Sequence, residues 1–132
     1  MPMLPEAVVA MLSCARIGAI HSVVFAGFSA NSLSDRINDS GAKVIITSDG
    51  NFRGDKIIPV KNIVDEAIQK TNSIETVIVL NRTNMDVLMK EGRDHWYHEI
   101  VKDESIENKA EIMDSEDSLF ILYTSGSTGS PK

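Results

Sequence analysis

Residues 43–80 read KVIITSDGNFRGDKIIPVKNIVDEAIQKTNSIETVIVL, and this stretch decides the fold. Two short β-branched runs, residues 43–47 and 76–80, each predict a buried strand. Between them, residues 60–68 place apolar side chains on one face at helical spacing, after a predicted loop at 48–58. A strand, a helix and a strand in this order favour the α/β class, with a mostly parallel sheet.

The same alternation continues on both sides of this stretch. Further strands are predicted at 20–25 and 119–123, and a helix is predicted between Ser29 as its N-cap and Gly41 as its stop. The N-terminal helix, at 5–17, is apolar on almost every side, which predicts that it is buried. The other segments are a polar stretch at 81–94, a short aromatic helix at 96–101 and an acidic connection at 103–117.

Composition narrows the class of protein. The 132 residues are 42% hydrophobic and 24% charged, which fits one folded domain or a piece of one. The net charge of −6, without a dense basic patch, argues against nucleic acid as a partner. No apolar stretch reaches the ~18 residues of a membrane span, so no membrane partner is expected. Cys14 has no second cysteine to pair with, and we therefore expect a reducing, cytoplasmic location.

The last ten residues, 123–132, read YTSGSTGSPK and directly follow an apolar strand. Glycines allow sharp turns and close backbone approach, while Ser and Thr hydroxyls and a lysine suit phosphate oxygens. In open α/β sheets, ligands bind beyond the carboxyl ends of the strands. The glycine and lysine spacing is not that of a Walker A loop. A flexible Ser/Gly linker is the alternative on composition alone.

This terminal stretch resembles the phosphate-binding signature of the adenylate-forming acyl-CoA ligase superfamily. Other segments are similar to the AMP-forming acetyl-CoA synthetases within it; they are residues 1–7, 15–23, 25–29, 91–94 and 120–123. The resemblance covers essentially the whole chain. It implies that residues 1–132 are a partial AMP-binding domain, truncated at both ends, from the large N-terminal domain of such a ligase.

The resemblance also implies a two-step reaction of the whole enzyme. Acetate and ATP form an acetyl-adenylate and pyrophosphate with the help of Mg²⁺, and coenzyme A then displaces AMP. The implied ligands of the ATP phosphates are Thr124, Ser125, Gly126, Ser127, Thr128, Gly129 and Lys132. Ser130 stands where lysine is common in the family. The segment alone is expected to be inactive, because the resemblance places the catalytic and magnesium-binding residues in the remainder of the parent chain.

A second implied site is the tetrad Arg53, Gly54, Asp55 and Lys56, which matches the place where the family contacts the phosphates of coenzyme A. From spacing alone, two cations in a loop are ordinary solvated side chains. Asp55 departs from the small residue usual in the family, so its carboxylate is expected to turn away from the ligand.

Two alternatives stay open at this point. The chain can belong to a ligase of another short acyl group such as propionate, because the residues that size the acyl pocket are not among those matched. It can also be a non-catalytic α/β module that binds a phosphorylated ligand. The remaining candidates favour structural roles: His21 as a core histidine, His95 and His98 without zinc-binding spacing, and Trp96 as a core anchor.

Overall fold

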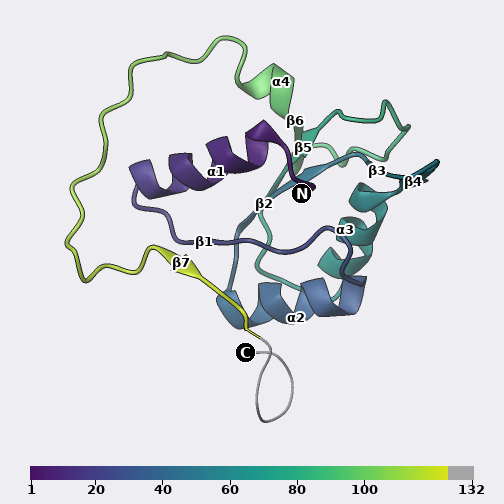
Figure 1. The fold of residues 1–132 in the computed structure, drawn as a ribbon, viewed down its shortest axis with the longest axis horizontal. Coiled ribbons are helices and arrows are strands. Elements are labelled where there is room, and N and C mark those ends of the chain that lie inside the picture. Colours follow the sequence, from purple (N-terminus) through teal and green to yellow (C-terminus); the bar gives the residue numbers. More distant parts are fainter. Residues whose placement is uncertain (125–132) are drawn as a thin grey trace. The chain divides into compact units, whose positions relative to one another are not determined.

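The computed structural model describes residues 1–124, whose fold is shown in Figure 1. The chain divides into two compact units, each built from two separate segments of the sequence. Unit 1 contains residues 1–4 and 24–106, and unit 2 contains residues 5–23 and, within the described chain, residues 107–124. Unit 1 holds the larger sheet with its helices, and unit 2 holds the N-terminal helix and a pair of short strands.

A three-stranded parallel sheet forms the centre of unit 1. Its strands are β2 (Val44–Ser48), β5 (Thr76–Leu80) and β6 (Asp94–Trp96), in the order β2-β5-β6. The first two confirm the predicted strands and the predicted parallel pairing. The third strand, β6, was not predicted. Its three residues are too few to show an alternating pattern in the sequence.

Helices α2 (Ala30–Ser40) and α3 (Val60–Ile68) pack against each other, and α3 also packs against β2 (Figure 1). Ser29 caps α2, because its Oγ accepts a hydrogen bond from the backbone N–H of Ser32 at 3.3 Å. Gly41 ends the helix with a left-handed φ of 62°, which favours glycine. Both caps confirm the predictions.

The core of unit 1 lies between these helices and the sheet. Its buried apolar side chains are Ala30, Ile37, Val60, Val64, Ala67, Val77 and Val79. Trp96 packs against the part of this core that contains Val64, Val77 and Val79, which confirms its predicted role as an anchor. Five of these seven side chains come from residues 43–80, and Ala30 and Ile37 come from α2.

Lys61 of α3 is completely buried, and its ammonium group lies in an ion cluster. Its Nζ is 2.7 Å from Oδ2 of Asp65 and 2.9 Å from Oδ2 of Asp94, and it donates to the carbonyl oxygen of Leu88. Arg93 pairs with the same two carboxylates. Burial raises the pKa of Asp94, but hydrogen bonds from Arg93, a backbone amide and Lys61 outweigh it and hold that pKa well below its ordinary value. The cluster ties α3 to β6 and to the segment that precedes it.

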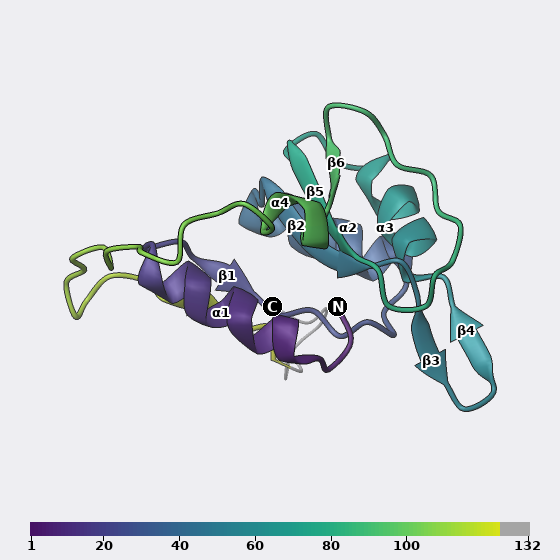
Figure 2. The ribbon, with the colours of Figure 1, turned by 90° about the horizontal axis from the view of Figure 1, so that it is seen from above.

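Residues 48–58, predicted as a loop, contain a β-hairpin. Strands β3 (Asn51–Arg53) and β4 (Lys56–Ile58) pair antiparallel, and the hairpin projects from the rest of unit 1 in Figure 2. Three-residue strands with charged ends carry little strand signal, which explains the difference from the prediction. After β6, the one-turn helix α4 (Tyr97–Ile100) confirms the predicted aromatic helix.

Unit 2 consists of α1 (Pro5–Arg16) and the parallel strands β1 (His21–Ser22) and β7 (Phe120–Ile121). The segment before β7 is held to the end of α1, since the backbone N–H of Glu111 donates to the carbonyl oxygen of Arg16 at 2.8 Å. Both strands are shorter than the sequence predicts.

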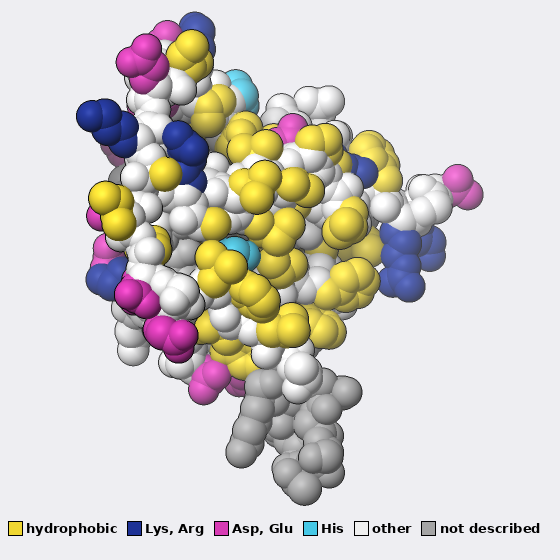
Figure 3. Space-filling view, turned by 60° about the vertical axis from the view of Figure 1, so that its left-hand side comes forward, with side chains coloured by type: hydrophobic (Ala, Val, Ile, Leu, Met, Phe, Trp, Pro, Cys, Tyr) yellow, Lys and Arg dark blue, Asp and Glu magenta, His cyan; other side chains and the backbone are white. Residues whose placement is uncertain are grey.

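The prediction that α1 is buried on most sides is wrong for the chain as the structure describes it. No residue of α1 is buried, and the side chains of Val8, Val9 and Leu12 are about half exposed or more. Apolar side chains are also exposed beside β7, and hydrophobic groups gather on the face drawn in Figure 3. The sequence predicts how apolar α1 is, whereas burial also requires a neighbouring element to cover it.

Candidate functional site

The hairpin places two cations side by side. Arg53 and Lys56 are partners in the β3–β4 register, so their side chains leave the same face of the hairpin. Opposite residues of an antiparallel pair have Cβ atoms about 4.5–5.5 Å apart, and like charges in this arrangement repel each other. Neither cation forms a salt bridge within residues 1–124, and both side chains are exposed. The pair is therefore available to an anionic ligand, which would relieve the repulsion.

The turn of the hairpin consists of Gly54 and Asp55. Gly54 has a φ of +57° at the first of the two positions, as the tight hairpin turns with glycine at that place require. A Cβ on Gly54 would meet nothing within 4 Å, so the requirement is conformational rather than steric. Asp55 is exposed at the second position. The predicted tetrad is thus brought together as one hairpin tip.

Asp49, a residue that the sequence analysis did not single out, fixes the base of the hairpin. Its carboxylate is fully buried and accepts hydrogen bonds from the backbone amides of Gly50, Arg82, Thr83 and Met85 at 2.6–3.1 Å. The hydroxyl of Thr83 donates to it as well, at 2.8 Å. One side chain therefore joins the end of β2, the start of the hairpin and the loop after β5.

The electrostatics of Asp49 agree with this geometry. Burial raises the pKa of the carboxyl group, but the hydrogen bonds from Arg82, Gly50, Thr83 and Met85 outweigh burial and lower that pKa. Asp49 is thus held as a carboxylate, which can accept but not donate hydrogen bonds.

The predicted phosphate loop begins beyond β7. Thr124 is exposed at the end of the described chain. The other predicted ligands of the ATP phosphates, Ser125, Gly126, Ser127, Thr128, Gly129 and Lys132, lie outside the described residues. Their roles stay predictions.

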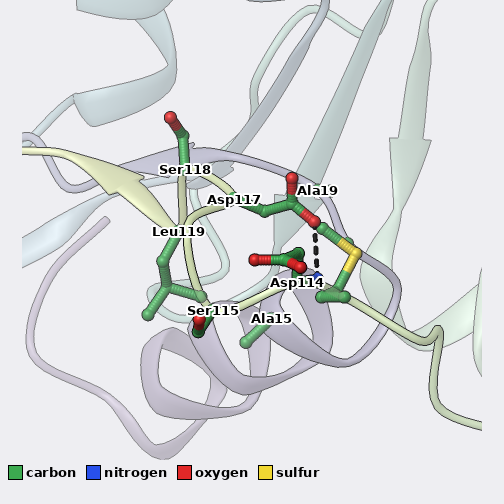
Figure 4. A pocket seen from close by; sticks show the side chains of 9 residues that line it. Ala15, Ala19, Asp114, Ser115, Asp117, Ser118 and Leu119 are labelled. Atoms are coloured by element: carbon green, nitrogen blue, oxygen red, sulfur yellow. Dashed lines mark hydrogen bonds between the residues drawn. The ribbon is translucent and has the colours of Figure 1, made fainter.

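A cavity of about 210 Å³ lies within unit 2, between the end of α1 and residues 113–119 (Figure 4). Asp114 and Asp117 lie on its wall, where the backbone N–H of Asp114 donates to Oδ2 of Asp117 at 2.8 Å. None of the predicted site residues in the described chain lines this cavity. It therefore gives no support to either predicted phosphate site.

The structure supports no chemical role for His21 or Cys14. Nδ1 of His21 is buried and has no hydrogen-bond partner among residues 1–124, so the side chain is not the satisfied core histidine that we expected. Cys14 is partly buried, and this burial raises the pKa of its thiol. In the described part of the chain, no three His, Cys, Asp or Glu residues lie close enough together to hold a metal ion. No helix there is long and apolar enough to cross a membrane.

The family comparison matches the whole chain. Residues 1–132 match the family described as AMP-binding enzyme. Two acetyl-coenzyme A synthetases, from Methanothrix thermoacetophila and Rhodopirellula baltica, are each 58% identical over 132 residues, and a third, from Xylella fastidiosa, is 57% identical over 134 residues. The match covers 100% of this chain and 20–21% of those proteins. The chain thus spans about a fifth of the length of the curated relatives it matches.

A solved structure agrees in fold. The acetoacetyl-CoA synthetase from Streptomyces lividans superposes with a TM-score of 0.85 at 28% sequence identity, over 99% of this chain and 20% of that one. The strands and helices described above therefore correspond to about a fifth of that synthetase.

Proposed function

Because this chain belongs to the family of AMP-binding enzymes, we propose that it is part of an acetyl-CoA synthetase, which joins acetate to coenzyme A at the expense of ATP. The observation that carries this proposal is the 58% identity to acetyl-coenzyme A synthetases over all 132 residues. In this proposal, residues 1–132 are an internal part of the AMP-binding domain. Its partners are small molecules in the cytoplasm and the remainder of the parent chain.

The proposed reaction has two steps. A carboxylate oxygen of acetate attacks the α-phosphorus of ATP, and the bond to pyrophosphate breaks to leave acetyl-adenylate. The thiolate sulfur of coenzyme A then attacks the acetyl carbon, and AMP leaves as the thioester forms. Residues of this chain take part by binding and orienting phosphate groups, which is electrostatic and positional catalysis.

In this proposal, one segment of the chain binds the phosphates of ATP and another binds the phosphates of coenzyme A. We assign the β and γ phosphates of ATP to Thr124 and the residues that follow it to Gly129, with Lys132 offsetting the charge of the departing pyrophosphate. We assign the phosphates of coenzyme A to the Arg53 and Lys56 pair, whose shared face and lack of salt bridges in the described chain support this role. Mg²⁺ would stabilise the negative charge of the first step, but the described residues provide no ligand set for it.

The experiment that tests this function separates the two steps in the full-length enzyme. Arg53→Ala and Lys56→Ala should each raise the KM for coenzyme A by about ten- to a hundredfold, because a charge-assisted hydrogen bond contributes ~1.5–3 kcal/mol. Acetate-dependent exchange of pyrophosphate into ATP should stay within about twofold of the unchanged enzyme, since coenzyme A enters only afterwards.

Lys43→Ala is the matched control, because Lys43 lies in the same unit and, within residues 1–124, its ammonium group forms only an exposed pair with Glu75. It should leave both steps unchanged. Exchange that is supported by propionate but not by acetate would contradict the acyl substrate, and absence of any exchange would favour a non-catalytic binding module. An unchanged KM for coenzyme A in both hairpin variants would overturn the assignment of the hairpin.

A further inference from the structure

The hairpin has a second face, opposite to the cation pair. Phe52 and Ile57 are register partners one position further from the turn, so their side chains leave the face opposite to Arg53 and Lys56. Phe52 is 53% exposed and Ile57 is 43% exposed, which leaves this apolar face only partly covered.

The loop after β5 lies against this second face. The guanidinium carbon of Arg82 lies over the Phe52 ring, 5.8 Å from its centroid, within the range of a cation–π contact. The entry to the hairpin is also close to the loop: a Cβ on Gly50 would lie 2.6 Å from Oγ1 of Thr83. The hairpin therefore contacts the loop both at its base and along β3.

The loop itself has a fixed shape. Asp49 accepts the backbone amides of Arg82, Thr83 and Met85, so the loop is anchored directly to the end of β2. Asn84 has a left-handed φ of 53°, and its backbone N–H donates to Oδ1 of Asn81 at 3.1 Å. A side chain that extends from this loop can therefore act as a rigid support.

We propose that the contact of Arg82 with Phe52 is a brace, which fixes the direction of the β3–β4 hairpin and so presents Arg53 and Lys56 to the phosphates of coenzyme A. Arg82 and Phe52 are positioning residues in this proposal, which rests on the function proposed above. The brace lowers the entropy that the hairpin loses when the ligand binds, because the cation pair is already held in place.

The test compares Arg82→Ala, Phe52→Ala and the double variant in the full-length enzyme. Each single variant should raise the KM for coenzyme A by about two- to fivefold, the range of an exposed cation–π contact, without changing acetate-dependent ATP–pyrophosphate exchange. The double variant should be no weaker than either single variant, because both remove the same contact. Arg82→Lys should restore most of the affinity, and Lys43→Ala should have no effect.

Amide hydrogen exchange provides a second readout that does not depend on coenzyme A. In both single variants, residues 51–58 should exchange faster while β5 stays protected. Unchanged exchange in the hairpin would overturn the brace. Additive increases in KM would also overturn it, because they would mean that Arg82 contacts the ligand by itself.

If Arg53→Ala and Lys56→Ala raise the KM but the brace variants do not, the brace fails and the proposed function stands. If the hairpin exchanges faster but Arg53→Ala and Lys56→Ala leave the KM unchanged, the proposed function of the hairpin fails, and with it the role of the brace in binding.

Discussion

Replacement of Lys61 by Met is expected to lower the free energy of unfolding by about 3–5 kcal/mol, the usual effect of breaking a buried ion pair from one side. Lys61 and the side chain of its partner Asp94 are completely buried. The methionine fills most of the space of the lysine stem but leaves the carboxylate of Asp94 with less compensation in a low-dielectric interior. Urea-induced unfolding of the chain, followed by the fluorescence of its single tryptophan, Trp96, measures the change.

Two further variants show whether the buried charge is the cause. Lys43→Met breaks the pair with Glu75, in which both side chains are more than 60% exposed, and should change the free energy of unfolding by less than about 1 kcal/mol. Adding Asp94→Asn to Lys61→Met should cost less than the sum of the two single changes, because it removes the carboxylate that has lost Lys61. Equal losses for Lys61→Met and Lys43→Met would contradict the interpretation.

Asp49→Ala is expected to lower the free energy of unfolding by at least about 3 kcal/mol, since each buried donor left without a partner costs ~1–3 kcal/mol. The change would deprive the backbone amides of Gly50, Arg82, Thr83 and Met85 of their acceptor. Asp49→Asn should be nearly as harmful. Each carboxylate oxygen accepts at least two N–H groups, so the amide nitrogen would face donors in either orientation.

The dependence of stability on pH provides a specific signature of Asp49. Its pKa is lowered in the folded state, so its contribution is complete above the unfolded pKa of about 3.9 and is lost as the pH falls through the folded pKa. Unfolding free energies measured from about pH 2 to 7 should therefore fall less steeply at the acid end for Asp49→Ala than for the unchanged chain. Asp86→Ala, an exposed change in the neighbouring loop, should keep the original slope and stability. An unaltered slope in Asp49→Ala would argue against the carboxylate.

The elements of unit 1 were largely predictable, because their signals are local. The β-branched runs, the helical spacing of α3 and the caps Ser29 and Gly41 all depend on residues close together in the sequence. The hairpin, β6 and the exposure of α1 were not predictable in this way. Short strands are stabilised by their partners, and burial depends on segments from elsewhere in a fold.

In the candidate site, too, some features could be predicted from the sequence and others depend on contacts between distant residues. The family resemblance predicted that Arg53 and Lys56 contact phosphates, but their position on one face follows only from the hairpin register. Asp49 and Arg82 were missed because most partners of Asp49, and the Phe52 partner of Arg82, come from distant parts of the sequence. The Asp49-Gly50 pair after β2 gave no usable signal, because such a pair predicts a tight hairpin turn, whereas the turn of the hairpin lies at Gly54 and Asp55.

The pairing of β1 with β7 has a consequence for how the chain is made. The strands begin at residues 21 and 120, so the ribosome makes residues 24–106 of unit 1 between them. At synthesis rates of ~5–20 residues per second, about 5–20 s pass between the synthesis of β1 and that of β7. During that interval β1 has no strand partner, and the apolar side chains of Ile20 and Val23 beside it are exposed surface of the kind that promotes aggregation.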